Sequence, residues 1–390
     1  MSSAKYIYIV QVTRQLSIDI VNNFSRQGAD VHLITGVVES NYDALDQKVK
    51  LTSLIKYNST SSFKRLFTWS VFTVYSFFYV LFSSRKNELI LVTTPPFIVF
   101  IGLFFKKIRN QKYHLVIWDL YPDVLVNFGV SKESSLLIRI WKNMNIKCFN
   151  NAETIFTLGQ HIADAIQKYT KKEIVIIPNW VKSDFLKPIP KKDNPFAIEH
   201  KLTEKLVIMY SGNLGLTHNI ESIIDSAEIL KNNANIHFVI IGDGVKKVKI
   251  SQIVKEKKLE NVLLLPYQEK EVLPFSLGCA DIGVVTLSQG AENISVPSKT
   301  YYMLAAGSAI LALASADSEL GTLIAMHKCG EIFNGNNPQA IANFVLHLSL
   351  NKDDLIRFKD NSRKASFNYT PENAKLYYKY ICNKINLKHV

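Results

Sequence analysis

Hydrophobic and polar positions alternate along this chain with two different periods. Short apolar runs, typical of buried strands, are followed by segments in which apolar residues recur every three or four positions, as in amphipathic helices. This alternation predicts an α/β fold built from doubly wound parallel sheets. The predicted strands are Tyr6–Val10, Val31–Ile34, Leu89–Val92, His114–Trp118, Thr154–Phe156, Ile174–Ile177, Leu206–Tyr210, Phe238–Ile241, Val262–Leu265, Ile282–Val285 and Ala309–Leu313.

A stretch without apolar periodicity separates two groups of strands. Residues 182–200 combine three prolines with Lys and Asp, which predicts a linker. At about 150 residues per domain, 390 residues suffice for two domains that each bury a core. We therefore expect an N-terminal domain over 1–181 and a C-terminal domain over 201–369. Residues 370–390 predict a helix that packs back on the N-terminal domain.

An aromatic-rich run lies in the first half of the chain. Leu66–Phe82 carries no charge and is bordered by basic pairs on both sides, and Phe97–Phe105 ends in a further basic pair. The first run is at the lower limit for spanning a bilayer, and the second is too short. Two interpretations stay open: a buried helix of the α/β domain, and a partly exposed face that docks on a membrane.

Charge and cysteine usage narrow the range of partners. The net charge is +13, of which the first 180 residues contribute +9. Such an excess of positive charge attracts nucleic acid, an anionic bilayer or a phosphorylated substrate. No nucleic-acid-binding signature accompanies it, so we expect no nucleic-acid partner. The four cysteines lack metal-site or disulfide spacing, and no secretory signal pattern is seen, so we expect a reducing, cytoplasmic location.

Three turns with glycine, proline or polar residues follow successive strands of the second half. Glycines let backbone amides approach an anion, and a helix N terminus adds further donors. Ligands of open α/β sheets bind beyond the carboxyl ends of the strands, so we expect the turns to border one site. Each turn taken alone also fits ordinary turn chemistry. The candidate donor-binding residues in these turns are Gly212, Asn213, Gly215, His218, Gly242, Asp243, Pro266, Tyr267 and Gln268.

A second signal for an anion lies at residues 296–307. Pro297 is suited to opening a helix, which places Ser298 and Lys299 at the positive helix start. A lysine is unfavourable there unless an anion compensates, so ligand binding is favoured over a purely structural role. This run adds Pro297, Ser298, Lys299, Thr300 and Tyr302 to the donor-binding candidates.

Carboxylates follow one strand of the first half, in Trp118-Asp-Leu-Tyr-Pro-Asp123. Asp119 and Asp123 are suited to accept hydrogen bonds from sugar hydroxyls, or alternatively to cap the following helix. The first strand ends near the same edge of the sheet, where Arg14 contacts either a phosphate or solvent. The candidates on this acceptor or phosphate side are Thr13, Arg14 and Gln15.

Taken in order along nearly the whole chain, these motifs resemble those of the retaining glycosyltransferases of family four, in the subgroup of bacterial surface-polysaccharide enzymes. Ile177-Pro-Asn-Trp180, between the two halves, belongs to the same set. The resemblance implies a GT-B architecture of two facing Rossmann-like domains with a cleft between them. It also implies a nucleotide-sugar donor, UDP-linked, on the C-terminal domain, an acceptor on the N-terminal domain, and neither a metal nor another cofactor.

The chain departs from the family pattern at two places. Members keep an Arg and a Lys where this chain has Leu216 and His218, and two glutamates where it has Ile294 and Tyr302. These departures leave Lys299 as the clearest cation near the donor. The catalytic candidates are Asp119, Asp123, Lys299 and, as a substitute carboxylate, Glu292.

The implied reaction is transfer of a glycosyl group, with retention of configuration, to a lipid-linked saccharide. The protein would attach peripherally to the inner face of the plasma membrane, where an anionic surface is its partner. Two alternatives stay open. A sugar-nucleotide 2-epimerase of the same fold would consume the donor without an acceptor. A non-catalytic partner protein would bind the nucleotide sugar without turnover.

Overall fold

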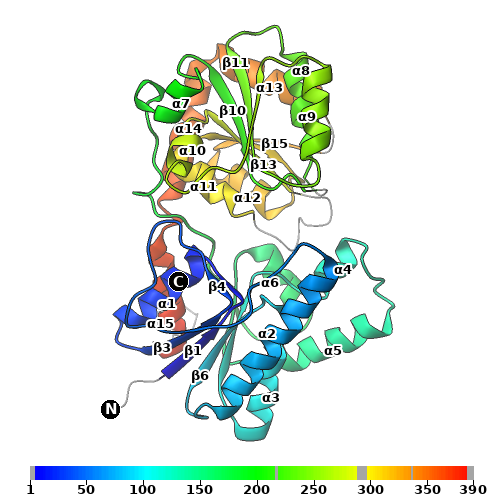
Figure 1. Ribbon diagram of the computed structural model, residues 1–390, viewed down its shortest axis with the longest axis vertical. Coiled ribbons are helices and arrows are strands. Elements are labelled where there is room, and N and C mark those ends of the chain that lie inside the picture. Colours follow the sequence, from blue (N-terminus) through cyan, green and yellow to red (C-terminus); the bar gives the residue numbers. More distant parts are fainter. Residues whose placement is uncertain (1–4, 216–217, 288–296, 335–336, 384–390) are drawn as a thin grey trace. The chain divides into compact units, whose positions relative to one another are not determined.

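The computed structural model describes residues 5–215, 218–287, 297–334 and 337–383, which fall into two compact units. The first unit contains residues 5–179 and 371–383, and the second contains the described residues from 180 to 370. Each unit is a parallel sheet covered by helices (Figure 1). The predicted α/β class with two parallel sheets is confirmed.

The sheet of the first unit has seven parallel strands in the order β5-β3-β1-β6-β7-β8-β9. Its central strands β1, β6 and β7 are buried on both faces, as expected for a parallel sheet covered by helices. Strands β2 and β4 form a separate two-stranded parallel sheet. The strands are β1 Lys5–Ile9, β2 Val12–Thr13, β3 Asp30–Thr35, β4 Val37–Val38, β5 Lys50–Ser53, β6 Glu88–Val92, β7 Tyr113–Ile117, β8 Ile155–Thr157 and β9 Ile174–Ile176.

The helices of the first unit include one from the far end of the sequence. Helix α15 packs on α1, where Tyr378 meets Phe24 edge-on at 5.1 Å between ring centroids. Its fully buried Tyr377 lies 4.7 Å from the ring of Phe156. The helices are α1 Gln15–Arg26, α2 Ser62–Phe82, η1 Pro96–Ile98, α3 Val99–Arg109, α4 Asp123–Asn127, α5 Leu136–Asn151, α6 Gln160–Gln167, η3 Pro371–Asn373 and α15 Ala374–Asn383.

The sheet of the second unit has six parallel strands in the order β12-β11-β10-β13-β14-β15. These strands are β10 Leu206–Ser211, β11 Ile236–Ile241, β12 Val262–Leu265, β13 Ile282–Thr286, β14 Ala309–Leu313 and β15 Gly330–Phe333. The helices are η2 Lys191–Asp193, α7 Pro195–Glu199, α8 Glu221–Ile229, α9 Lys247–Glu256, α10 Leu273–Gly278, α11 Lys299–Ala306, α12 Glu319–His327, α13 Pro338–Leu350 and α14 Lys352–Ser366.

The segment 182–200, expected to be a linker, is folded within the second unit. The side chain of Asn194 caps α7 by accepting hydrogen bonds from two backbone amides, and its amide group donates to the carbonyl oxygen of Phe275 at 2.8 Å. Phe196 and Ala197 of this short helix are buried. A five-residue helix is too short to show an apolar period, which is why the segment resembled a linker.

Helix α2 is largely exposed, which removes the buried-helix interpretation of the aromatic run. Its buried residues are Thr68, Phe72, Ser76 and Val80, which form one narrow stripe. Phe63 and Phe82, by contrast, are 79% and 85% exposed. Within the described ranges, α2 is the one helix long and apolar enough to cross a bilayer, by length and composition only.

A buried carboxylate joins distant parts of the second unit. Asp281, just before β13, accepts hydrogen bonds from the Val207 amide at 2.9 Å and from Lys359 at 2.8 Å, and it also pairs with Lys191. Burial acts to raise the pKa of Asp281, but the two ammonium groups outweigh it and hold this pKa below its usual value. Asp281 therefore ties α14 and η2 to the central strands.

We predict that Asp281→Asn lowers the free energy of unfolding of the protein by about 3–5 kcal/mol at pH 7, because two partly buried ammonium groups lose the buried carboxylate that they share. Since the folded pKa is depressed, this stabilisation exists above the unfolded pKa of about 3.9 and is lost as pH falls through the folded value. Urea unfolding at pH 7 and pH 3 measures both effects.

The exposed Asp317 supplies the control, because Asp317→Asn should leave stability unchanged within about 0.5 kcal/mol. A difference between parent and Asp281→Asn that is equally large at pH 3 and pH 7 would contradict the assignment.

Candidate functional site

The predicted turns of the second unit converge at one edge of its sheet. Strands β12, β11 and β10 are neighbours and run parallel, so the turns that follow them lie side by side. The turns are held by backbone hydrogen bonds: the Gly212 amide donates to the Ile241 carbonyl at 2.9 Å, and the Leu214 amide donates to the Asp243 carbonyl at 2.7 Å. The edge therefore presents a connected surface of backbone.

Two glycines in these turns approach each other more closely than side chains permit. A Cβ atom on Gly242 would lie 1.9 Å from the carbonyl oxygen of Gly212. Both glycines also have positive φ angles, +149° for Gly242 and +155° for Gly212, which L side chains rarely adopt. Only glycine fits either position, as the sequence predicts for turns that bring backbone close to a ligand.

Lys299, the first residue of α11, reaches across to the turn after β10. Its ammonium group donates a hydrogen bond to the Tyr210 hydroxyl at 3.0 Å and lies 4.2 Å from the centre of the Tyr210 ring. The same nitrogen would be 2.8 Å from a Cβ on Gly212, so it lies directly over this glycine. Tyr210 in turn donates to the Asn213 carbonyl at 2.6 Å. A cation, a glycine turn and a helix start thus meet at one point.

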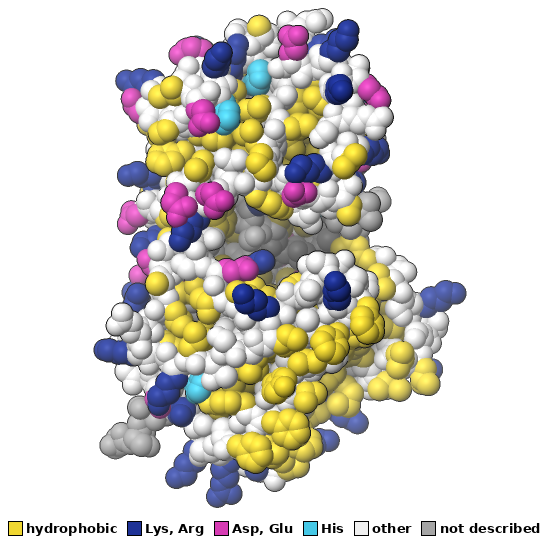
Figure 2. Space-filling model, in the orientation of Figure 1, with side chains coloured by type: hydrophobic (Ala, Val, Ile, Leu, Met, Phe, Trp, Pro, Cys, Tyr) yellow, Lys and Arg dark blue, Asp and Glu magenta, His cyan; other side chains and the backbone are white. Residues whose placement is uncertain are grey.

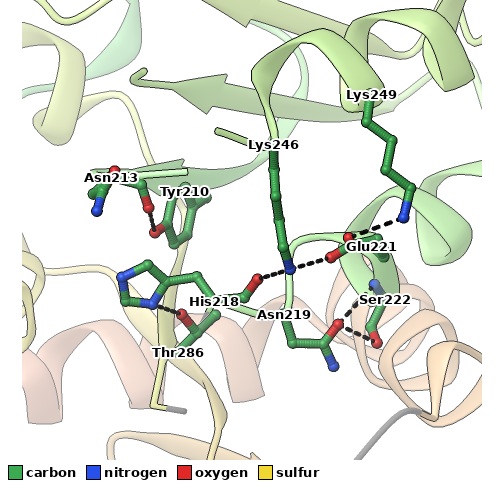
Figure 3. A network of polar contacts seen from close by, with 9 residues as sticks. All are labelled: Tyr210, Asn213, His218, Asn219, Glu221, Ser222, Lys246, Lys249 and Thr286. Carbon is green, nitrogen blue, oxygen red and sulfur yellow. Dashed lines mark hydrogen bonds and ion pairs between the residues drawn. The ribbon is translucent and has the colours of Figure 1, made fainter. Parts of the chain in front are cut away.

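His218 lies beside this cation and takes part in a polar network (Figure 3). Its Nδ1 is 3.0 Å from the Thr286 hydroxyl, and its carbonyl oxygen accepts a hydrogen bond from Lys246 at 2.7 Å. Lys246 also pairs with Glu221 at 2.8 Å, which neutralises it. Within the described ranges no such carboxylate partner is found for Lys299.

The electrostatics of the site favour an anion. Burial lowers the pKa of Lys299 to about 8. Burial, and then the charges of Lys299 and Lys246, lower the pKa of His218 to about 4, so the imidazole is neutral at pH 7. A negatively charged ligand would relieve both penalties, because it stabilises the protonated form of each group.

The other candidates of this edge differ in their surroundings. Asp243 is exposed and pairs with Lys247 at 2.9 Å, and Tyr267 is also exposed. Gln268 donates to the Pro266 carbonyl at 2.9 Å. The hydroxyl of Thr300 is buried and has no hydrogen-bond partner in the described part of the chain. Just before α11 lie Pro297 and Ser298, and Tyr302 lies within this helix. The turn after β10 contains Asn213 and Gly215.

Three of the residues considered above lie outside the described residues. These are Glu292, Leu216 and Ile294, so the proposed substitute carboxylate has no structural account.

Asp119 of the first unit is half-buried just after β7. Its backbone amide donates to the Thr93 hydroxyl at 3.4 Å, as does that of Trp118 at 3.1 Å. Burial raises the pKa of the Asp119 carboxyl, and no described cation counters this. A cavity of about 10 Å³, roughly room for one water, lies against Asp119, Tyr121 and Asn145. The carboxyl group thus lies beside a cavity of water size, and its contact with a sugar stays a prediction.

Asp123 has partners within its own unit. It is the first residue of α4, and its carboxylate accepts a hydrogen bond from the Tyr169 hydroxyl at 2.5 Å. Its other oxygen is 3.7 Å from the ammonium group of Lys142. These contacts connect α4 with α5 and the end of α6, so Asp123 positions the turn that carries Asp119.

The three residues that follow the first strands also have partners. Thr13 is buried and donates to the Thr35 hydroxyl at 2.8 Å, and Gln15 is buried and donates to Asp19 at 2.9 Å. Arg14 pairs with Glu39 at 3.1 Å on the surface. Of the three, Arg14 alone is exposed to solvent.

A cluster of aromatic rings beside Asp119 was missed by the sequence analysis. Trp69 of α2 meets Tyr121 edge-on at 5.8 Å, and Trp141 of α5 stacks on Tyr121 at 6.1 Å. Phe97 completes the cluster, at 6.4 Å from Trp69 and 5.1 Å from Trp141. These rings come from four separate segments, so no spacing in the sequence signals their proximity. The contacts of Tyr210 with Lys299 and of Thr286 with His218 were likewise not predicted, because each joins separate segments of the second unit.

Comparison with known proteins shows which glycosyltransferases this chain resembles. Residues 191–365 match the family model described as glycosyl transferases group 1. WbjE of Pseudomonas aeruginosa, named as a glycosyltransferase, is 26% identical over 268 residues, which cover 67% of this chain and 66% of WbjE, just under two thirds of that protein. WcaI of Escherichia coli, named as a colanic acid biosynthesis glycosyl transferase, is 26% identical over 328 residues, 78% of this chain and 80% of WcaI.

Solved structures match along almost the whole chain. Anabaena HepE in complex with UDP and glucose has a TM-score of 0.73 at 12% identity and covers 98% of this chain and 100% of its own. WaaG, a glycosyltransferase involved in lipopolysaccharide biosynthesis, has a TM-score of 0.72 at 12% identity and covers 97% and 99%. At these identities the likeness shows the fold, and it confirms the expected GT-B class.

We predict that Lys299→Ala weakens UDP binding roughly tenfold to a hundredfold at pH 7, because a charge-assisted bond is lost. In the parent, affinity should fall between pH 7 and pH 9, since Lys299 loses its proton above about pH 8 while the phosphates stay charged. The Ala variant should show no such fall in this range. Calorimetric titration at both pH values measures the effect.

Uridine, which lacks phosphates, should bind parent and Lys299→Ala alike. Lys299→Arg keeps its charge at pH 9 and should bind UDP equally at both pH values. Equal UDP affinity in the parent and the Ala variant at pH 7 would make Lys299 an ordinary structural lysine.

Proposed function

We propose that this chain, which matches the group 1 glycosyl transferase model over residues 191–365, moves a glycosyl group from a nucleotide-diphosphate sugar to a lipid-linked saccharide. The process would be the synthesis of a surface polysaccharide, such as a capsule, O-antigen or exopolysaccharide. The names of WcaI and WaaG, which refer to colanic acid and lipopolysaccharide, support this assignment.

The observation that carries the proposal is the ammonium group of Lys299 over the glycine turn at Gly212. A diphosphate suits this position because the site offers one partly desolvated cation and a backbone surface that side chains do not obstruct. The crystal structure of HepE with UDP and glucose supports UDP as the nucleotide, since it has the same fold. The proposal includes no metal ion at the diphosphate.

In the proposed mechanism, negative charge grows on the departing diphosphate while the glycosidic bond breaks. Lys299 and the start of α11 stabilise that charge, and they are already in place before the reaction. The sugar keeps its anomeric configuration, and the leaving phosphate is suited to take the proton of the acceptor. Asp119 orients the acceptor hydroxyl, while Asp123 holds its turn through Tyr169 and Lys142.

Attachment to a membrane is part of the proposal, because the first unit carries a broad apolar surface. Hydrophobic side chains gather over α2 (Figure 2). Exposed basic residues border them, and such a combination favours weak binding to anionic lipid at the cytoplasmic face. The exposed apolar residues of this surface are Phe63, Leu66, Phe67, Val74, Tyr75, Phe78, Leu81, Phe82, Phe104, Ile108, Leu136, Leu137 and Ile140.

Asp119→Asn should lower the turnover of sugar transfer roughly tenfold to a hundredfold, because the acceptor loses a charged hydrogen-bond partner. The dissociation constant for UDP should not change, since Asp119 belongs to the first unit. The assay combines purified protein, a panel of UDP-sugars and a lipid-linked saccharide, with product detected by mass spectrometry.

The exposed Asp164 of α6 provides a matched control, and Asp164→Asn should transfer at the parent rate. Full transfer by Asp119→Asn would contradict the role of this carboxylate. Consumption of the UDP-sugar at the same rate without any acceptor would contradict the transferase proposal itself.

Membrane attachment predicts that the protein floats with anionic vesicles at low salt and much less at high salt. Phe82→Ser should lower the partition coefficient roughly tenfold to a hundredfold, because a fully inserted aromatic ring contributes about 1.5–3 kcal/mol. Phe367→Ser, an exposed phenylalanine of the second unit, is the matched control and should float like the parent. A protein that stays unbound at both salt concentrations would show that this surface does not bind lipid.

A further inference from the structure

An apolar groove lies in the first unit between α2 and the segment formed by η1 and α3. Its volume is about 490 Å³, within the range of about 300–1,000 Å³ for small-molecule pockets. Its single hydroxyl, that of Thr73, already donates to the Trp69 carbonyl at 2.7 Å, so the groove offers its occupant hydrocarbon. It is lined by Thr73, Val74, Phe77, Phe78, Phe97, Phe100, Ile101 and Phe104.

The groove is open to solvent. Val74, Phe78 and Phe104 are 53%, 49% and 43% exposed, although they form its walls. A concave apolar surface of this kind is costly in water and is typical of a binding site for an apolar ligand. The groove also belongs to the apolar surface of α2 and α3, which connects it with the proposed membrane contact.

A row of side chains on α2 leads from a cation to the groove. Arg65, Trp69, Thr73 and Phe77 follow one another at intervals of four, which places them on one face of the helix. At about 1.5 Å per residue, Arg65 is roughly 12 Å along the axis from Thr73. The guanidinium of Arg65 lies 5.5 Å from the centre of the Trp69 ring, and no described carboxylate pairs with it.

The same rings connect the groove with Asp119. Phe97 lines the groove and meets both Trp69 and Trp141, and these two rings contact Tyr121. Burial, and then the neighbouring carboxylate of Asp119, raise the pKa of Tyr121 to about 12, while Arg65 acts in the opposite direction. Cation, carboxylate and groove therefore surround one aromatic cluster.

We propose that this groove binds the hydrocarbon chain of the lipid phosphate that carries the acceptor saccharide. Arg65 contacts the phosphate, and the saccharide extends over the aromatic cluster toward Asp119. One groove with one cation fits a single-chain lipid phosphate, whereas a bilayer phospholipid has two chains. The identity of the occupant as acceptor rests on the proposed function, but the groove and its cation do not.

The positive charge of the segment that forms the groove favours the binding of a phosphate near Arg65. Between residues 62 and 112 the chain has eight Lys and Arg residues and a single acidic residue, Glu88. Glu88 is engaged with Lys112 at 3.1 Å and His114 at 3.1 Å. The segment that forms the groove therefore attracts a lipid phosphate, and its single carboxylate is already paired.

The test uses farnesyl phosphate below its aggregation concentration, titrated into the full chain by calorimetry. Farnesyl phosphate should bind, inorganic phosphate should not bind measurably, and Arg65→Ala should weaken the binding of farnesyl phosphate roughly tenfold to a hundredfold. Farnesol, which lacks the phosphate, should bind the parent and Arg65→Ala equally.

Two tryptophan substitutions separate the groove from the membrane surface. Val74→Trp adds an indole inside the groove and should weaken farnesyl phosphate binding at least tenfold. Tyr75→Trp places the same ring on the neighbouring exposed position, outside the groove, and should bind like the parent. Both variants should still float with anionic vesicles, because tryptophan is favourable at the membrane interface.

Equal farnesyl phosphate affinity in Val74→Trp and Tyr75→Trp would overturn the proposal. Binding of dihexanoyl phosphatidic acid as tight as that of farnesyl phosphate would also overturn it, because the groove would then suit a bilayer phospholipid. UDP titration keeps the two proposals distinct. If the protein binds UDP but not farnesyl phosphate, only the lipid-binding proposal is wrong. If it binds farnesyl phosphate but neither UDP nor a UDP-sugar, the proposed transferase function is wrong.

Discussion

The close approach of Gly212 and Gly242 is the constraint on which the candidate donor site depends. The carbonyl oxygen of Gly212 occupies the place that a Cβ on Gly242 would need, so the two turns form one layer of backbone at the edge of the sheet. Gly212 leaves space on its other side as well, and the ammonium group of Lys299 fills it. The absence of two side chains thus brings the ammonium group of Lys299 directly against the backbone of the turn.

The partly buried lysines of the second unit have two kinds of surroundings. Lys191 and Lys359 share the carboxylate of Asp281, which lowers the pKa of that group, and Lys246 pairs with Glu221. Lys299 instead meets the ring and hydroxyl of Tyr210, and its own pKa falls to about 8. Because a cation without a carboxylate costs stability, its persistence at the ligand-binding edge of the sheet is best explained by an anion that completes the site.

The sequence predicted those features that depend on local pattern. The buried central strands and the glycine turns after them were found because apolar runs and turn residues are visible without tertiary structure. Strand β5, with the sequence Lys-Leu-Thr-Ser, was missed because an edge strand is exposed and polar. The segment around Asn194 resembled a linker because its helix is too short for a period. The contact of Lys299 with Tyr210 joins residues 89 positions apart, and no sequence pattern predicts such a contact.

The surface of helix α2 consists of a buried stripe and a broad exposed apolar part. A helix that is apolar all round is normally enclosed by protein or lipid, yet the buried residues of α2 form a single stripe. The side next to that stripe carries Trp69 and Phe77 toward η1 and α3, and the remaining side exposes residues such as Phe63 and Phe82. Exposing this much aromatic surface to water costs free energy that a lipid phase would recover. The composition of α2 therefore fits two apolar surroundings: the core of the first unit stabilises one stripe, and the proposed membrane contact would cover the rest.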